Sequence, residues 1–334
     1  MGPGGFYPFV KYLYECGVFS GKAVIFGKDL FVKSVYIIIV TYNGMRWIDK
    51  CLDSLKESKY PSTMLVIDNH SSDGTAAFIG RHYPDVRLTI SSRNLGFGQA
   101  NNIGMRKALE EGADYVFLLN QDAYVEPETI GRLVDAHAAN ASFGILSPLH
   151  FNGKGDALDV YFEQYLSRSS GGGEGEESPR GEWRRDALVR TEFVNAAAWL
   201  ISAGCLRQVG GFDPLFFHYG EDDNYAHRVL FHGWGIGVLT SARIRHDREL
   251  RTGVKGTDAV LKEEWKHILV RACDVRRPGY RVFMIRRGVR HGLWALKGLM
   301  RFDISSFKYH FWLSRRTLGY VGHVGRSRKK GRPL

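Results

Sequence analysis

Residues 115–122 read YVFLLNQD, an apolar run that is followed directly by Asn120, Gln121 and Asp122. An apolar run of this length, with aromatic and β-branched residues, predicts a buried strand. Open α/β sheets bind ligands beyond the carboxyl ends of their strands, which is where Asp122 falls. A carboxylate there suits Mg²⁺ or Mn²⁺ held against a diphosphate. The alternative is an ordinary turn residue, because turns also favour Asp.

Strand and helix patterns alternate on both sides of this stretch. Short apolar runs predict strands at Val35–Val40, Met64–Asp68, Val86–Ile90, Tyr115–Leu119 and Gly144–Leu146. Apolar residues three and four apart predict helices at Trp47–Lys56, Ser72–Tyr83, Gly98–Glu110 and Pro127–Ala139. The alternation predicts an α/β fold with a mostly parallel central sheet flanked by helices.

We expect three parts along the chain: an N-terminal extension over 1–33, a single nucleotide-binding domain over 34–250, and a C-terminal extension over 251–334. A Gly-, Ser- and Glu-rich stretch within 167–183 cannot bury a core and predicts a mobile loop insertion. Regular structure is expected to resume at Glu192–Ser202, followed by a helix from Ala203.

The composition excludes several classes of protein. The four cysteines are far apart, so neither a zinc site nor a disulfide framework is predicted. No apolar run approaches the roughly 20 residues needed to cross a bilayer, and the N-terminus lacks the pattern of a signal peptide. We therefore expect a cytoplasmic protein with reduced thiols.

Polar and small residues follow the other predicted strands as well. Thr41, Tyr42 and Asn43 lie between the first strand and its helix, and Asp68 ends the second strand. Turns at such places offer backbone N–H groups and polar side chains to a nucleotide. The third strand leads into a segment with Asn94, Gly96 and Asn102. The glycine fingerprint of dinucleotide folds is absent, and ordinary loops and a helix cap are the alternatives.

Three consecutive acids, Glu221, Asp222 and Asp223, precede a predicted helix that reaches Phe231. The helix dipole favours acids in a first turn, but crowded carboxylates can also supply a general base. His246 follows a predicted strand at Ile236–Leu239 and is either a surface residue or part of the site.

In their order and spacing, these segments resemble the family 2 glycosyltransferases with a GT-A type fold, over about Val35 to His246. Thr41-Tyr42-Asn43 is similar to the opening motif of that family, and Asp68 to its nucleotide-base segment. Asn120-Gln121-Asp122 sits at the metal motif, usually Asp-x-Asp, and Glu221-Asp222 at the motif that holds the general base. The preceding Gly210-Gly211-Phe212-Asp213 resembles the subgroup that includes rhamnosyltransferases.

The resemblance implies transfer of a sugar, with inversion, from a nucleotide-sugar donor to a saccharide or lipid-linked acceptor in cell-surface polysaccharide or glycolipid synthesis. Asp222 would be the general base, with Glu221 and Asp223 as alternatives, and Asp122 and His246 would hold Mg²⁺ or Mn²⁺. The residues implied to bind the donor are Thr41, Tyr42, Asn43, Asp68, Asn94, Gly96, Asn102, Asn120 and Gln121.

Two positions depart from the family pattern. Asn120 stands where the first Asp of the metal motif is usual, and Asn224 where many members of the subgroup carry a second Asp after Asp222. Asn offers a carbonyl oxygen but adds no charge. These departures keep open a second reading, a catalytically inactive relative that binds a nucleotide sugar or a partner.

The positive charge is concentrated at the C-terminal end. From Arg271 onward there are 17 Lys or Arg against two acids, a balance of +15, which leaves −4 of the total of +11 for the rest. Over 280–332 the cations alternate with aromatic residues, and Val289–Met300 predicts an amphipathic helix on an anionic membrane surface, at the inner face of the membrane. Packing of the aromatics on the catalytic domain is the alternative, and nucleic acid is the partner we favour least.

Overall fold

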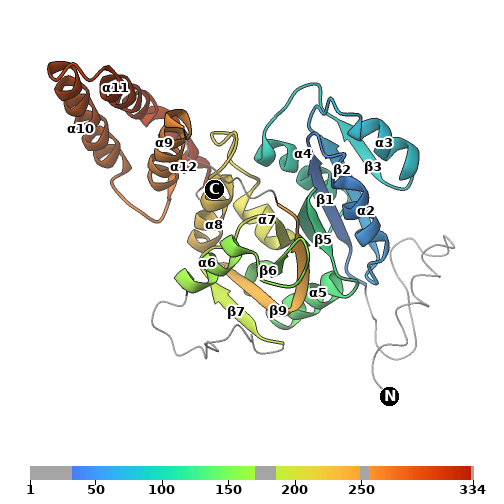
Figure 1. The fold of residues 1–334 in the computed structure, drawn as a ribbon. Helices are drawn as coiled ribbons and strands as arrows, with labels where there is room; N and C mark the ends of the chain where they lie inside the picture. The colour runs from blue at the N-terminus through green and yellow to red at the C-terminus, as the bar shows by residue number, and fades with distance from the viewer. Residues whose placement is uncertain (1–31, 170–185, 249–255, 332–334) are drawn as a thin grey trace, which may run out of the picture. The chain divides into compact units, whose positions relative to one another are not determined.

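The computed structural model describes residues 32–169, 186–248 and 256–331. It divides into two compact units (Figure 1). Unit 1 comprises the described residues of Met1–Gly96, Ala100–Arg207 and Trp234–Arg248, and unit 2 those of Phe97–Gln99, Gln208–Gly233 and Glu249–Leu334. The segment that carries Glu221 therefore groups with the C-terminal helices rather than with the sheet.

Unit 1 is built on a mixed sheet in which the strand order is β3-β2-β1-β4-β8-β6-β9-β5, with β7 paired to β9. The strands are β1 (Val35–Thr41), β2 (Ser62–Asp68), β3 (Arg87–Ile90), β4 (Tyr115–Asn120), β5 (Ala123–Val125), β6 (Phe143–Asn152), β7 (Leu188–Thr191), β8 (Ala198–Ser202) and β9 (Gly235–His246). Strands β3, β2, β1 and β4 are parallel, β8 is antiparallel to both of its neighbours, and β6 pairs with β9 in parallel.

Helices cover both faces of this sheet. Their bounds are α2 (Ile48–Lys56), α3 (Thr75–His82), α4 (Phe97–Glu110), α5 (Thr129–Ala139), α6 (Val160–Ser169) and α7 (Ala203–Val209). Successive side chains of a strand point to opposite faces, so Ile37 and Ile39 join the core formed with α2 and α5. Ile38 faces Gly104 of α4, where a Cβ would come within 2.7 Å of the Ile38 side chain, so glycine allows the close approach.

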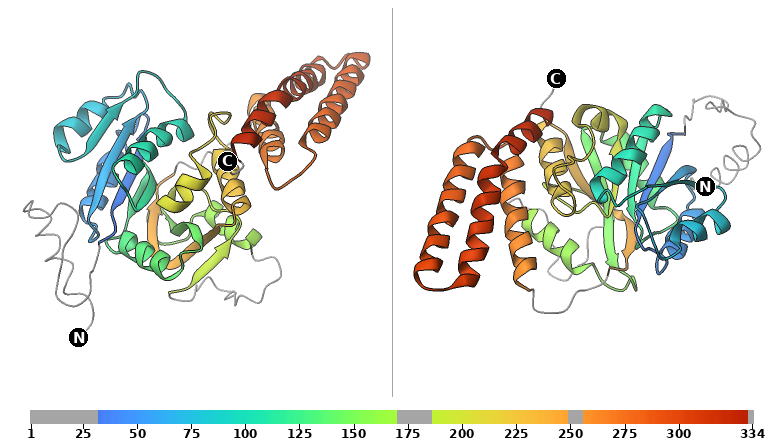
Figure 2. Two further views of the ribbon diagram at one scale, coloured as in Figure 1. Left: turned by 180° about the vertical axis from the view of Figure 1, so that it is seen from behind. Right: turned by 90° about the horizontal axis from the view of Figure 1, so that it is seen from above.

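Unit 2 contains α8 (Glu221–Phe231), α9 (Thr257–Cys273), α10 (Tyr280–Met300), α11 (Ile304–Gly319) and α12 (Val321–Lys330). Figure 2 shows α10 and α11 as a long antiparallel pair beside α9 and α12. A separate apolar core holds these helices together, with Trp265, Leu269, Met284, Leu313 and Val324 among its buried members. No helix in the described ranges is long and apolar enough to span a bilayer.

The predicted fold is confirmed: the sheet is mixed and mostly parallel, is flanked by helices, and is followed by C-terminal helices. Each predicted strand and helix of residues 34–146 is present, with ends shifted by a few residues or, for β6, by extension to Asn152. The expectation of continuous regular structure over Glu192–Ser202 is wrong for its first half. There the Thr191 hydroxyl donates to the carbonyl of Phe193, and this side-chain bond closes a turn instead.

Other expectations fall wholly or partly outside the described residues. The predicted loop over 167–183 is described only to Ser169, which ends α6, and of the predicted extension over 1–33 only Val32 and Lys33 are described. The three-part division of the chain stays a prediction. Three cysteines, Cys51, Cys205 and Cys273, are described, and all are buried free thiols.

Candidate active site

The carboxyl ends of three parallel strands lie side by side in unit 1. Thr41 pairs in register with Asp68, and Val40 pairs with Asn120. Neighbouring strands are about 4.8 Å apart, so the ends of β2, β1 and β4 form one row. The structure confirms that Asp68 lies one strand from Thr41, and it adds Asn120 on the other side.

Gln121 holds the loop that follows β1. Its Oε1 accepts hydrogen bonds from the Thr41 hydroxyl at 2.7 Å and from the Tyr42 backbone N–H at 2.9 Å. Gly44 leaves room for this side chain, since a Cβ there would lie 2.4 Å from Gln121 Oε1. The hydroxyl of Thr41 and the amide of Gln121 therefore satisfy each other, while the Tyr42 side chain remains exposed.

Asn43 joins the two loops that follow β1 and β2. Its backbone N–H donates to Ser71 Oγ at 2.9 Å, and its side-chain oxygen accepts from the Ser72 N–H at 2.9 Å. The residue has a φ of +49°, a left-handed conformation that Asn tolerates better than most residues. Asn43 thus holds the loops that follow β1 and β2 in a fixed arrangement beside the strand ends.

Asp68 is buried at the end of β2. One carboxylate oxygen accepts a hydrogen bond from the Ser71 N–H at 3.0 Å. The other, Oδ2, is buried and has no hydrogen-bond partner in the described part of the chain. A buried acceptor that has no donor destabilises the folded protein. A ligand N–H or hydroxyl that donated to Oδ2 would remove this destabilisation, which would favour binding.

The segment from Asn94 to Asn102 is shaped by a residue that the sequence analysis did not select. The buried Asn69 donates to Asn94 Oδ1 at 3.0 Å and accepts from the Leu95 N–H at 2.7 Å. Asn94 Oδ1 also accepts from the Gly96 N–H at 2.8 Å, and Gly96 has a φ of +77° that favours glycine. Asn102 lies half-buried in α4. Only the position of Asn69 directly after Asp68 could have signalled its part.

Asp122 and His246, far apart in sequence, meet because β5 pairs with β9. Ala123 is opposite His246 in that antiparallel pair, which brings Asp122 Oδ1 to 3.3 Å from His246 Nε2. Burial alone would raise the pKa of Asp122, but the hydrogen bond from His246 and nearby positive charge outweigh it, and the pKa is lowered. Asp122 is therefore a carboxylate at neutral pH.

Arg248, also missed by the sequence analysis, sets the tautomer of His246. Its guanidinium lies 3.0 Å from His246 Nδ1 and pairs with Asp159 at 2.8 Å. A guanidinium can only donate, so Nδ1 is the acceptor and the ring proton sits on Nε2, facing Asp122. His246 therefore acts as a donor to Asp122 in this arrangement.

The residues present fit a divalent cation at Asp122. Two ligands about 2.1 Å from one octahedral ion are about 3 Å apart, close to the Asp122–His246 separation of 3.3 Å. Within the described ranges no three His, Cys, Asp or Glu side chains cluster for a metal, so an ion here would need phosphate oxygens and water as well. His246 itself fits as a ligand once Arg248 leaves Nδ1, because Nε2 must lose its proton.

The acid cluster belongs to unit 2. Gly220, with a φ of +91°, leads into α8, which begins with Glu221, Asp222 and Asp223. Burial, together with the charge of Asp222, raises the pKa of Glu221 to about 8 and that of Asp223 to about 7. Glu221 Oε2 is buried without a hydrogen-bond partner among the described residues. Glu221 and Asp223 therefore keep their protons to higher pH than ordinary carboxyl groups do.

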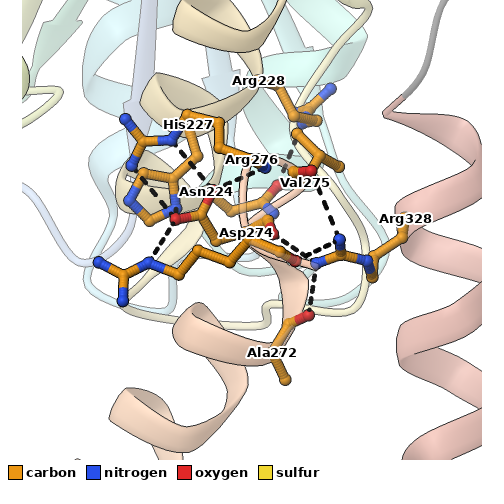
Figure 3. Close-up of polar contacts among 9 residues, drawn as sticks. Asn224, His227, Arg228, Ala272, Asp274, Val275, Arg276 and Arg328 are labelled. Atoms are coloured by element: carbon orange, nitrogen blue, oxygen red, sulfur yellow. Dashed lines mark hydrogen bonds and ion pairs between the residues drawn. The ribbon is translucent and has the colours of Figure 1, made fainter. Parts of the chain in front are cut away.

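Buried arginines anchor the helix that carries these acids (Figure 3). Arg228 donates from Nε to Asn224 Oδ1 at 3.2 Å and from its two terminal nitrogens to the carbonyls of Val209 and Gly211. Asn224, one of the two departures from the family pattern, is itself buried. Its side-chain oxygen helps to hold Arg228 in place.

A second arginine ties α12 to the end of α9. Arg328 donates to the carbonyl of Ala272 in the last turn of α9 and to the carbonyls of Asp274 and Arg277 beyond it (Figure 3). The buried Asp274 carboxylate pairs with Arg276 and Arg277 at 3.0 and 3.1 Å. The start of α8 is therefore supported by a network that reaches the last helix of the chain.

Comparisons with known proteins agree with this fold. Residues 36–174 match a protein family that is described as "Glycosyl transferase family 2". The N-acetylglucosaminyl-diphospho-decaprenol L-rhamnosyltransferase of Mycobacterium tuberculosis is 30% identical over 237 residues, 65% of this chain and 77% of that protein. The galactofuranosyltransferase GlfT1 of the same organism is 28% identical over 319 residues, 90% of this chain and 96% of its own length.

Solved structures support the fold alone. Residues 1–349 of TarS from S. aureus align with a TM-score of 0.51 at 14% identity, over 89% of this chain and 90% of that one. This alignment shows that the chain has an α/β fold of the GT-A type. The chain belongs to glycosyltransferase family 2.

Proposed function

We propose that the protein is an inverting glycosyltransferase that moves a hexose from a nucleoside-diphosphate donor to a hydroxyl of a saccharide carried on a lipid diphosphate. The row of polar strand ends, from Asp68 through Thr41 to Asn120, carries this proposal, together with Asp122 beside His246. The lipid-linked acceptor is supported by the name of the mycobacterial relative, which specifies a diphospho-decaprenol substrate.

The donor nucleoside is proposed to bind at Asp68, whose unpaired Oδ2 would accept a hydrogen bond from the base or ribose. The backbone of the loops held by Gln121 and Asn43 would line the same edge. The further donor-binding residues proposed are Thr41, Tyr42, Asn94, Gly96, Asn102 and Asn120. Asn69, Gln121 and Asn43 already hold these loops in place through hydrogen bonds in the free protein. The entropy lost by ordering the loops on donor binding should therefore be small.

Asp122 is proposed to hold Mg²⁺ or Mn²⁺, with His246 joining it when Arg248 moves from Nδ1. Such an ion, when bound, would neutralise charge that develops on the leaving diphosphate. Asp122 contributes a carboxylate that is already ionised. Before an ion binds, His246 keeps that carboxylate oriented through its Nε2 hydrogen.

Asp222 is proposed to accept the proton of the attacking acceptor hydroxyl. A general base must be deprotonated at the working pH, and its neighbours Glu221 and Asp223 hold their protons more tightly than usual. Burial is the main cause of both raised pKa values, and the charge of Asp222 adds to it.

The basic, aromatic segment 280–332 is proposed to bring the enzyme to the anionic inner face of the membrane, where a lipid-linked acceptor would be found. The rival reading, a catalytically inactive relative, rested on Asn120 and Asn224. Asn224 bonds to the buried Arg228, so it has a structural part in unit 2 whichever reading holds.

One assay separates these readings. The purified chain is incubated with dTDP-rhamnose, UDP-GlcNAc and other nucleotide sugars, with a prenyl-diphosphate saccharide, in Mn²⁺ or in excess chelator. We expect transfer from one donor in Mn²⁺ only, and Asp122→Ala should weaken donor binding in Mn²⁺ while changing it little in chelator. The exposed Asp156→Ala is the matched control. Full activity in excess chelator would show that transfer needs no metal ion. Measurable donor binding without any turnover would support the reading as a catalytically inactive relative.

A further inference from the structure

Helix α10 is packed with its small residues inside and its large apolar residues outside. Its buried members are Met284, Gly288, His291, Ala295 and Gly298. Its exposed apolar members include Val282, Ile285, Val289, Leu293, Leu296 and Met300, each at least 49% exposed. A helix that is covered by water on its outer face has the opposite distribution.

The exposed residues form one continuous stripe. At 3.6 residues per turn, Val282, Ile285, Val289, Leu293, Leu296 and Met300 fall within an arc of about 80° on the helix. The buried residues lie on the other side of the helix. We call these six residues the α10 stripe. It faces away from the core of unit 2 along the whole length of the helix.

Close packing of α11 explains why the inner face is made of small residues. A Cβ on Gly288 would lie 2.6 Å from the Leu318 side chain, and one on Gly298 would lie 2.9 Å from the backbone nitrogen of Phe307. The Ser314 hydroxyl donates to the Gly288 carbonyl at 2.8 Å. Glycine thus lets α10 and α11, which run side by side in Figures 1 and 2, approach closely. The side chains of the α10 stripe are exposed.

Cations lie beside the stripe, and acids are absent from it. Helix α10 has five Arg or Lys and no Asp or Glu. Arg286, Arg290 and Lys297 occupy the next arc of the helix, are exposed, and form no ion pair among the described residues. At the turn between α10 and α11, Met300 and Phe302 are 74% and 90% exposed.

We infer that the α10 stripe is the surface that enters the headgroup region of an anionic bilayer, with α10 parallel to the membrane plane. An apolar stripe flanked by cations matches the two zones of that interface, because acyl chains lie beneath negatively charged headgroups. Five cations exclude a spanning position for the helix. The inference rests on the proposed attachment through 280–332 and assigns it to one face of one helix.

The test measures sedimentation of the full chain with vesicles of phosphatidylglycerol and phosphatidylcholine. The double variant Leu293→Ser/Leu296→Ser should bind at least about tenfold more weakly than the wild type, because it removes two large apolar side chains from the interface. Val260→Ser, on an exposed residue of α9, is the control and should bind like the wild type. All three substituted residues are exposed, so both variants should be as stable as the wild type.

The charge on α10 has its own test. Arg290→Gln/Lys297→Gln should weaken binding at low salt by about fivefold per cation, and the loss should shrink as salt rises. Lys50→Gln/Lys262→Gln removes the same charge from exposed positions on α2 and α9 and is the matched control.

Three results would overturn the inference, and they differ in what else they overturn. If the wild type ignores anionic vesicles at low salt, both the stripe and the proposed attachment are wrong. If the wild type binds but Leu293→Ser/Leu296→Ser binds equally well, or if the stripe instead mediates self-association in the absence of lipid, the α10 stripe is wrong while attachment through 280–332 stands. Neither result depends on sugar transfer, so the enzymatic proposal is judged separately.

Discussion

Helices α2 and α10 both have large apolar residues repeated at helical spacing, but α2 buries these residues whereas α10 exposes most of them. Helix α2 buries Ile48, Cys51, Leu52 and Leu55 against the sheet and leaves Asp49 and Lys50 in water. Helix α10 buries glycine, alanine and histidine and exposes leucine, valine and isoleucine. Periodicity reveals that a helix has two faces, but the packing partner decides which face is inside.

The two units differ in their polar groups as well. In unit 1 the loops beyond the strand ends are satisfied by Gln121, Asn43 and Asn69, and Asp122 is held as a carboxylate. In unit 2 one carboxylate oxygen of Glu221 is buried without a hydrogen-bond partner among the described residues, and burial raises the pKa of Glu221. The groups proposed to bind the donor thus lie in unit 1, whereas the proposed general base, Asp222, lies among the acids of unit 2.

The largest expected effect tests that difference in roles. Asp222→Asn should lower turnover by about 10²–10⁴-fold, because a positioned base is lost, while calorimetry should find nucleoside-diphosphate binding unchanged. Asp223→Asn is the matched control, and it should be milder since Asp223 is protonated through much of the neutral range. If Asp223→Asn proves the crippling change, the base has been assigned to the wrong acid.

The comparison of α2 with α10 predicts opposite results for the same substitution. Leu52→Ala should lower the free energy of unfolding by about 2–5 kcal/mol, because it leaves a cavity in the core. Leu296→Ala, on an exposed leucine, should change it by no more than about 0.5 kcal/mol. Chemical denaturation of both variants measures this, and equal losses would show that the α10 stripe is buried in solution.

Asp68 tests whether unit 1 binds the nucleoside at the strand ends. Asp68→Ala should weaken binding of free nucleoside diphosphate by about 1–3 kcal/mol, because a partner of the buried ligand group is lost. Glu110→Ala, on an exposed acid of α4, is the control. An unchanged affinity for Asp68→Ala in calorimetry would place the nucleoside elsewhere.

The smallest expected effect is the dependence of stability on pH. Glu221 has a pKa raised from 4.5 to about 8, so between these values the folded chain holds a proton that the unfolded chain has lost. Its contribution to the free energy of unfolding is therefore greatest near pH 4.5 and is lost as pH rises to about 8. The nearby Lys266 offsets part of the loss. Thermal denaturation of Glu221→Gln should show a weaker fall over this window, and an identical profile would mean that Glu221 is ionised in the folded chain.

The strands from Val35 to Leu146 and the polar residues after them could be predicted from the sequence, because a buried parallel strand is a short apolar run and its end is marked by the first polar residues. For the same reason Thr41, Asp68 and Asp122 could be selected without coordinates. Asn69 and Arg248 could not, since each acts by a hydrogen bond to a side chain chosen by the fold.

The sequence by itself determined which residues are apolar, which are charged and where strands end. Only the tertiary structure decided that His246 meets Asp122, because the register of β5 on β9 joins segments far apart in the chain. It also decided that the pKa of Glu221 is raised, because burial disfavours the charged carboxylate, and that the leucines of α10 face outward, because glycines make the closer contact with α11. Local periodicity is a property of consecutive residues, whereas burial is a property of what packs against them.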